Sequence, residues 1–203
     1  MIEVDRAGPR WTATLNRPDK ANALTGEMLG DLADVATEAA GKAQVLVLTG
    51  AGRVFSAGAD LEAARAGLAT DPVWERLSGA LAAFPGLSIC ALNGSLAGGA
   101  FGMALACDLR VAVREAKFFY PVMKLGFLPQ PSDPVRMAAL VGPARAKMIL
   151  MGGAKIEADE ALAWGLVDRV VAAEDLDDNV AALAADAESA KASHVSAIKQ
   201  MIR

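Results

Sequence analysis

Residues 48–61 read Leu48-Thr49-Gly50-Ala51-Gly52-Arg53-Val54-Phe55-Ser56-Ala57-Gly58-Ala59-Asp60-Leu61, and residues 91–102 read Ala91-Leu92-Asn93-Gly94-Ser95-Leu96-Ala97-Gly98-Gly99-Ala100-Phe101-Gly102. Each segment follows a β-branched run typical of a strand and ends in a stretch typical of a helix. Small residues let backbone approach backbone or ligand closely, and free N–H groups at a helix start favour negative charge. If the segments met in space, they would offer two N–H donors to one oxyanion. Two unrelated strand-to-helix turns would explain the same spacing.

Strand-like and helix-like stretches alternate on both sides of these segments, which predicts an α/β fold. Runs that are β-branched or alternate in polarity predict strands at 2–6, 11–16, 44–49, 88–92, 109–113, 117–120 and 167–171. Helices are predicted at 25–40, 61–69, 72–83, 99–106, 135–140, 144–151, 158–164 and 175–191. Gly41 is placed to end the first of these helices, and Pro143 to begin another.

Length and composition fit one domain with a proper core. The chain has 203 residues, of which 54% are hydrophobic and 22% charged. No stretch approaches the roughly 18 apolar residues of a membrane span, and the charged N-terminus is unlike a signal peptide. A net charge of −4 gives no support for nucleic-acid binding. These features predict a cytoplasmic protein without membrane or nucleic-acid partners.

Several kinds of site find no support in the sequence. Cys90 and Cys107 lie in apolar runs without metal-ligand spacing, so we expect buried reduced thiols. His194, the only histidine, lies in a helical stretch and is expected at the surface, and no metal is predicted. The third glycine of a dinucleotide-binding motif would fall at Phe55. Neither a P-loop nor a nucleophile elbow is present.

Both glycine-containing segments resemble the signature loops of the enoyl-CoA hydratase/isomerase (crotonase) superfamily. Further stretches match the superfamily in the same order, and the resemblance covers essentially the whole chain. These stretches are Asn16-Arg17-Pro18-Asp19-Lys20-Ala21-Asn22-Ala23-Leu24, Cys107-Asp108-Leu109-Arg110-Val111-Ala112, Lys124-Leu125-Gly126-Phe127-Leu128-Pro129 and residues 158–171.

The resemblance implies a fold and an assembly. A crotonase-like spiral of ββα units is expected over residues 1–134, followed within the same domain by a helical portion over residues 135–203. Relatives usually continue for several more helical turns, so this portion is expected to be shortened. Relatives form trimers or dimers of trimers, and a homotrimer or hexamer is expected here.

By resemblance, the oxyanion hole consists of the backbone N–H groups of Ala59 and Gly99. An acyl thioester that loses an α-proton accumulates negative charge on its carbonyl oxygen, and two fixed N–H donors stabilise that enolate. Asp60 is expected to cap the helix that follows rather than to act as a catalytic acid.

The acid/base positions depart from those of the hydratases. The two hydratase glutamates correspond to Gly102 and Val122, neither of which moves a proton. Gln130, Asp133 and Tyr120 are the candidates for a replacement role. Asp133 could instead form an Asx-Pro turn that caps the helix from about residue 135, and Tyr120 could simply pack in a strand.

The same resemblance places coenzyme A, as part of the substrate and with no other cofactor, against two segments. The Ser56–Leu61 loop would hold the adenine through Ala57, Gly58, Ala59, Asp60 and Leu61. Lys20 with neighbouring Ala21 is the first candidate for the phosphates, followed by Arg17 and Arg65. The acyl pocket is expected to be lined by Phe55, Leu68, Leu96 and Phe101.

Two functions remain open at this point. One is an acyl-CoA enzyme of fatty acid metabolism, a lyase or isomerase that stabilises an enolate. Isomerisation, decarboxylation or thioester hydrolysis would then be preferred over hydration, because both hydratase glutamates are absent. The other is a homologue that binds an acyl-CoA thioester without turnover.

Overall fold

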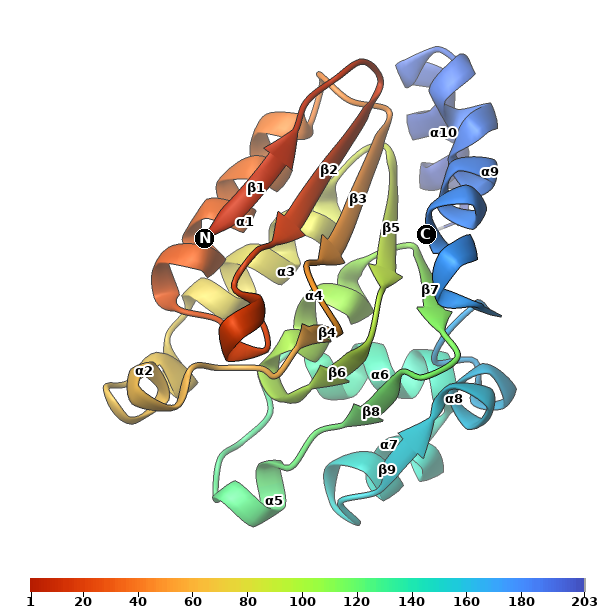
Figure 1. The fold of residues 1–203 in the computed structure, drawn as a ribbon. Helices are drawn as coiled ribbons and strands as arrows, with labels where there is room; N and C mark the ends of the chain where they lie inside the picture. The colour runs from red at the N-terminus through yellow and green to blue at the C-terminus, as the bar shows by residue number, and fades with distance from the viewer. Residues whose placement is uncertain (203) are drawn as a thin grey trace.

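The computed structural model describes residues 1–202 as an α/β structure with two sheets (Figure 1). The strands are β1 (Ile2–Asp5), β2 (Arg10–Leu15), β3 (Val45–Gly50), β4 (Val54–Ser56), β5 (Leu87–Leu92), β6 (Ser95–Ala97), β7 (Leu109–Val113), β8 (Lys117–Phe119), β9 (Lys155–Glu157) and β10 (Arg169–Val171). The α-helices are α1 (Gly26–Ala39), α2 (Leu61–Arg65), α3 (Val73–Ala83), α4 (Phe101–Ala106), α5 (Val122–Leu125), α6 (Asp133–Val141), α7 (Pro143–Leu150), α8 (Ala158–Trp164), α9 (Leu176–Ser189) and α10 (Ala192–Ile202). Short 3₁₀ helices are η1 (Pro18–Lys20), η2 (Leu68–Thr70), η3 (Gly98–Ala100) and η4 (Ala173–Asp175).

The chain winds repeatedly from the larger sheet to the smaller one. The larger sheet has the order β1-β2-β3-β5-β7-β10 and is parallel except for the β1–β2 pair. The smaller sheet has the order β4-β6-β8-β9, with β9 antiparallel to β8. Successive units β3-β4-α2, β5-β6-α4 and β7-β8-α5 each contribute one strand to each sheet and then a helix. This is the predicted spiral of ββα units.

Helices cover both faces of the larger sheet, whose central strands β3, β5 and β7 are accordingly buried along most of their length, whereas β2 alternates. On β2, Trp11, Ala13 and Leu15 are buried, whereas Thr12 and Thr14 lie on the other face in a groove that α9 also lines. α1 packs against β1, β2 and α3, and Met28, Leu29, Leu32, Val35 and Ala36, which recur at the helix period, are buried. Gly41 follows this helix at φ +87°, and Pro143 begins α7, as predicted.

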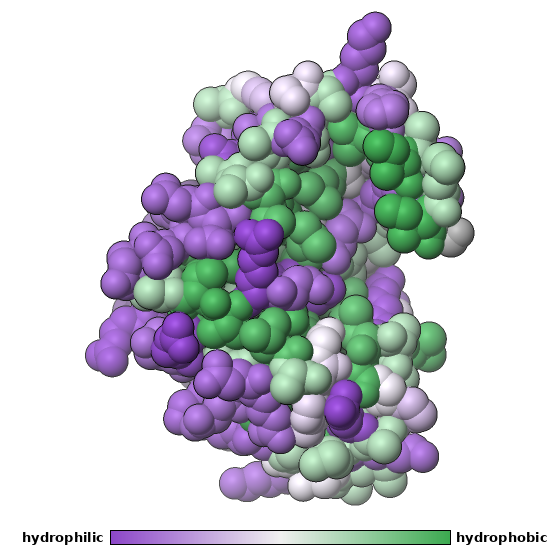
Figure 2. Space-filling model, turned by 90° about the vertical axis from the view of Figure 1, so that its right-hand side faces the viewer, coloured by the Kyte–Doolittle hydropathy of each residue, from purple (hydrophilic) through white to green (hydrophobic). Residues whose placement is uncertain are grey.

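The last helix is held to the larger sheet by one lysine. The Nζ of Lys199 donates to Oδ2 of Asp108 at 2.6 Å and to the carbonyl of Gly86 at 2.9 Å. Beside this anchor, α9, α10 and the strand residues Leu87 and Leu109 line a largely apolar groove of about 660 Å³. Figure 2 views this side of the molecule, where apolar patches lie between polar ones.

The shortest elements were not predicted. β4, β6 and β9 have three residues each and α5 has four, which leaves little pattern to identify, although β8 and β10, also of three residues, were predicted at 117–120 and 167–171. α10 was also missed. The helix predicted at 61–69 is divided, because Gly67 adopts φ +111° between α2 and η2. Over residues 1–202, no helix is long and apolar enough to cross a membrane.

Candidate functional site

The two glycine-containing segments meet in space. Gly58 adopts φ +90°, and a Cβ atom there would lie 2.9 Å from the carbonyl oxygen of Ala97 and 3.3 Å from Cα of Gly98. Such a contact excludes any side chain, so the two loops touch through their backbones. The reading of two unrelated turns, left open by the sequence, is therefore wrong.

A short parallel bridge orients the first N–H group of the site. The N–H of Leu24 donates to the carbonyl of Gly58, and the N–H of Asp60 donates to the carbonyl of Leu24, both at 2.8 Å. In this arrangement the N–H of the intervening residue, Ala59, points away from Leu24. Among residues 1–202 the Ala59 N–H has no acceptor.

The second N–H group belongs to Gly99, in the 3₁₀ turn that leads into α4. The first N–H groups of a helix have no partner within it, and no acceptor for the Gly99 N–H occurs among the described residues. A Cβ on Gly99 would lie 3.0 to 3.3 Å from the indole of Trp74. The buried Trp74 ring is itself fixed, because its Nε1 donates to the carbonyl of Leu68 at 2.7 Å.

Ala59 and Gly99 line one cavity of about 280 Å³, which is mostly apolar. The other lining residues are Ala57, Leu61, Ala64, Arg65, Ala69, Trp74, Ala97, Gly98, Phe119, Tyr120, Pro121, Val122, Leu125, Phe127, Leu128 and Gln130. The lining predicted from sequence is wrong: Phe55, Leu68, Leu96 and Phe101 are buried in the core and do not reach this cavity. Their apolar character indicated burial but not which surface they contact.

Tyr120 and Asp133 form a buried pair at the wall of the cavity. The Tyr120 hydroxyl donates to Oδ2 of Asp133 at 2.9 Å and accepts from the N–H of Gln130 at 3.4 Å. The Tyr120 ring stacks on Phe101, with centroids 5.4 Å apart. Burial, with the nearby Asp133 charge, raises the pKa of Tyr120. Tyr120 lines the cavity and Asp133 lies behind it.

Asp133 is a fully buried carboxyl group that is only half hydrogen-bonded. It is the first residue of α6, and its Oδ1 has no hydrogen-bond partner among residues 1–202. Burial raises the pKa of Asp133 to about 7, with a contribution from Glu75, against the opposing effects of the Tyr120 hydrogen bond and Arg136. The predicted Asx-Pro cap is therefore wrong, because the side chain points to Tyr120 and caps nothing.

The same carboxyl group lies next to Gly102, one of the two positions that the resemblance matches to a hydratase glutamate. A Cβ on Gly102 would lie 3.0 Å from Oδ1 of Asp133. Val122, at the other substituted position, is buried and lines the cavity. The amide Nε2 of Gln130 donates to the carbonyl of Ala69 at 3.1 Å, which positions this side chain at the cavity wall.

The residues predicted to hold coenzyme A are only partly brought together. Ala57, Ala59 and Leu61 line the cavity, whereas Lys20 is exposed on η1 and neither it nor Ala21 reaches the cavity. Asp60 caps α2, as predicted: its Oδ1 accepts from the N–H groups of Glu62 and Ala63.

Arg17 and Asn22, both in the stretch of residues 16–24, have structural roles. Arg17 donates from Nη1 to Oδ2 of Asp60 at 2.8 Å, so this cation is already paired. Hydrogen bonding to Arg17 and to backbone N–H groups lowers the pKa of Asp60. Asn22 is buried, and its amide donates to the carbonyls of Ala51 and Val54 at 2.9 and 2.8 Å. These hydrogen bonds from residues 16–24 therefore hold the first glycine-containing segment, residues 48–61, in place.

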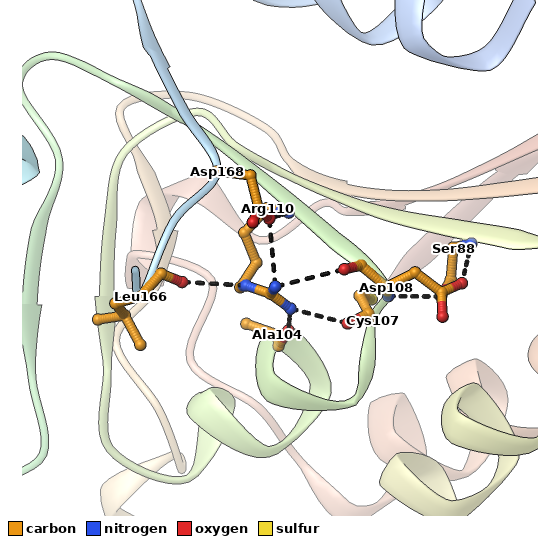
Figure 3. Close-up of polar contacts among 7 residues, drawn as sticks. All are labelled: Ser88, Ala104, Cys107, Asp108, Arg110, Leu166 and Asp168. Carbon is orange, nitrogen blue, oxygen red and sulfur yellow. Dashed lines mark hydrogen bonds and ion pairs between the residues drawn. The ribbon is translucent and has the colours of Figure 1, made fainter. Parts of the chain in front are cut away.

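A buried arginine fixes the other end of the helix that Gly99 leads into (Figure 3). The Arg110 Nη1 donates to the carbonyls of Cys107 and Ala104 at 2.7 and 3.3 Å, at the end of α4. Its Nε donates to the carbonyl of Leu166 at 2.9 Å, and its Nη2 pairs with Asp168 at 3.1 Å. Arg110 thus ties α4 to β7 and to the loop before β10.

The predicted thiols and histidine lie where the sequence placed them. Cys90 and Cys107 are free and buried, and burial raises the pKa of Cys90. His194 is exposed on α10. Over residues 1–202, no group of three or more His, Cys, Asp or Glu side chains could hold a metal ion.

Comparisons with known proteins give one family. The model of the enoyl-CoA hydratase/isomerase family matches residues 11–203. The chain is 35% identical to the carnitinyl-CoA dehydratase of Citrobacter koseri, over all of this chain and 80% of that protein.

Solved structures agree with this assignment. An enoyl-CoA hydratase from Mycobacterium avium subsp. paratuberculosis superposes with a TM-score of 0.91 at 32% identity, over 99% of this chain and 83% of that one. An enoyl-CoA hydratase/carnithine racemase from Magnetospirillum magneticum superposes with a TM-score of 0.91 at 32% identity, over 99% of this chain and 79% of that one. The α/β spiral is thus a crotonase fold, and the chain belongs to the enoyl-CoA hydratase/isomerase family, whose members process acyl-CoA thioesters.

Proposed function

We propose that this protein is an acyl-CoA enzyme in which the N–H groups of Ala59 and Gly99 stabilise an enolate formed from a bound thioester. The supporting observation is that both N–H groups lack acceptors among residues 1–202 and belong to residues lining one mostly apolar cavity. In a water-poor site, fixed donors of this kind act without reorganising during the reaction, and loss of one costs about 3–4 kcal/mol in a comparable enzyme.

Tyr120 and Asp133 would supply the proton transfer. When the substrate loses its α-proton, the Tyr120 oxygen accepts it and passes its own proton to Oδ2 of Asp133, 2.9 Å away. Protonation of the enolate reverses these two steps, and no free tyrosinate forms. A pKa of about 7 for Asp133 lets it hold or release that proton near neutral pH. Gln130 orients the pair through its backbone N–H.

One proton-transfer pair favours some reactions over others. Isomerisation removes a proton and returns it at another carbon, and decarboxylation needs a proton only after CO₂ has left. Hydration by the family's two-glutamate route requires groups that Gly102 and Val122 do not provide. The Citrobacter relative is named a dehydratase, and dehydration is hydration in reverse, so β-hydroxyacyl-CoAs belong in the test although Gly102 and Val122 disfavour this reaction.

The test is to incubate the protein with enoyl-, β-hydroxyacyl-, malonyl- and saturated acyl-CoAs and to follow products by mass spectrometry. We expect turnover of at least one thioester. We also expect crotonyl-CoA hydration at least about a hundredfold below that of an ordinary hydratase, because positioned acid/base groups contribute about 10²–10⁴-fold. Hydration at ordinary rates would contradict the acid/base assignment. Binding without any turnover would support the rival function, an acyl-CoA-binding homologue.

We also propose that the protein assembles as a homotrimer or hexamer. The apolar groove beside α10 and the exposed side chains of Ile198, Met201 and Ile202 support an association surface. Light scattering at micromolar concentration would test this, and a stable monomer would contradict it.

A further inference from the structure

Among the residues that the structure describes, one charged residue, Arg65 of α2, lines the cavity. Leu61, Ala64 and Arg65 all line it, and their i, i+3, i+4 spacing places them on a single helix face. Glu62, which points elsewhere on the helix, does not line the cavity. The face of α2 that begins beside Ala59 thus ends in Arg65, an exposed cationic residue that lines the cavity.

Arg65 has no anionic partner in the structure. Among residues 1–202 its guanidinium makes no ion pair or hydrogen bond, and no carboxylate lines the cavity. The closest acidic residue before the helix, Asp60, is already satisfied by Arg17 and by two N–H groups of α2. The polar groups of Tyr120 and Gln130 are engaged with Asp133 and with Ala69. As far as residues 1–202 show, the cavity therefore combines mostly apolar walls with one exposed cationic residue, Arg65, that makes no ion pair.

We propose that the acyl group accepted here carries a second carboxylate, remote from the thioester, and that Arg65 binds it and so determines substrate specificity. This inference rests on the proposed function. Guanidinium groups bind carboxylates through paired hydrogen bonds that are stronger than neutral ones. A helix rises about 1.5 Å per residue, so Arg65 lies about 6 Å along α2 from Leu61. That offset places the carboxylate several carbons from the carbonyl held at Ala59.

The experiment compares glutaryl-CoA, pentanoyl-CoA and free coenzyme A by isothermal titration calorimetry. The first two ligands have five-carbon acyl groups and differ in the terminal carboxylate, and the third lacks an acyl group. The proteins are wild type, Arg65→Gln, and Arg114→Gln as a control, since Arg114 is exposed beyond β7 and does not line the cavity. Thermal melts verify that each variant is folded.

We expect wild type to bind glutaryl-CoA more tightly than pentanoyl-CoA. Arg65→Gln should weaken glutaryl-CoA binding about tenfold, in line with a hydrogen-bonded charge pair, and leave the other two ligands unchanged. Equal weakening of all three ligands would assign Arg65 to the coenzyme A phosphates and overturn the inference. Equal binding of both thioesters by wild type would also overturn it while leaving the proposed function intact. Failure of wild type to bind any thioester would overturn both.

Discussion

The hydroxyl of Tyr120 donates a 2.9 Å hydrogen bond to Oδ2 of Asp133, whose other oxygen, Oδ1, has no partner among residues 1–202. A buried carboxyl group with an unsatisfied oxygen destabilises a fold, and such groups with perturbed pKa values cluster at functional sites. Here the carboxyl group lies directly behind a cavity-lining hydroxyl and beside Gly102. The fold therefore places a carboxyl group of α6 near Gly102 of α4, the position that the resemblance matches to a hydratase glutamate.

Replacing Tyr120 by phenylalanine should lower kcat by about 10²–10⁴-fold on any thioester that the wild type turns over. KM should change little, because the phenyl ring keeps its stacking on Phe101 and only the proton-transferring oxygen is lost. Steady-state kinetics measure both parameters, and calorimetry with a saturated thioester verifies that binding survives. A variant that keeps wild-type kcat would show that Tyr120 only packs.

Replacing Asp133 by asparagine should change how stability depends on pH. The pKa of this carboxyl is about 7 in the folded protein and about 3.9 when unfolded, so between these values the folded state binds more protons. Wild type should therefore lose stability as pH rises from about 4 to 7, on the order of 4 kcal/mol, and remain level above that range. The side chain of the variant cannot ionise in this pH range, so the variant should not show this loss of stability.

Urea unfolding at pH 5, 6, 7 and 8 measures the effect. The difference in unfolding free energy, variant minus wild type, should rise up to about pH 7 and then become constant. The side-chain amide introduced by Asp133→Asn also lowers stability, by an amount that does not depend on pH, because it lacks a full set of hydrogen-bond partners. Only the change of the free-energy difference with pH therefore reports on the pKa of Asp133. A difference that does not vary with pH would mean that Asp133 keeps an ordinary pKa.

Substituting Gly58 by alanine should separate the two glycine loops. At φ +90° the side chain is strained by about 1–2 kcal/mol, and its Cβ would also lie 2.9 Å from a carbonyl oxygen of the other loop. Gly67→Ala is the matched control, because Gly67 has φ +111° with nothing within 4 Å of the added Cβ. Gly58→Ala should be clearly the more destabilising in thermal melts. Equal effects would mean that the loops do not depend on this contact.

The order of the longer elements could be predicted from the sequence because their patterns are intrinsic. The buried spacing of α1 and the alternation on β2 follow from helix and strand periods of 3.6 and 2. β4, β6 and β9 were not predicted: each lies within or beside a glycine-containing loop or turn whose pattern is not that of a strand, and each gains its stability from a partner distant in sequence. The resemblance to the superfamily supplied the spiral that connects them.

The candidate site was likewise predicted from the sequence only in part. The glycine content of residues 48–61 and 91–102 indicated close backbone approach, and the contact between Gly58 and Gly98 confirms it. The sequence placed Tyr120 and Asp133 as separate candidates, since nothing local links residues in β8 and α6. Arg65 was predicted only as a candidate for the coenzyme A phosphates, behind Lys20 and Arg17; only the three-dimensional structure shows that it lines the cavity while Arg17 pairs with Asp60.

The most direct test of the account measures the carbonyl stretch of a bound, isotope-labelled acyl-CoA by infrared difference spectroscopy. It compares wild type with Gly99→Pro, which removes the N–H, and with Gly99→Ala, which keeps the N–H. Both variants place a Cβ about 3 Å from Trp74, so the alanine variant controls for that crowding. Circular dichroism verifies folding. We predict a shift to lower frequency in wild type that Gly99→Ala largely retains and Gly99→Pro largely loses. An unshifted carbonyl in wild type, or a full shift in folded Gly99→Pro, would contradict the oxyanion assignment.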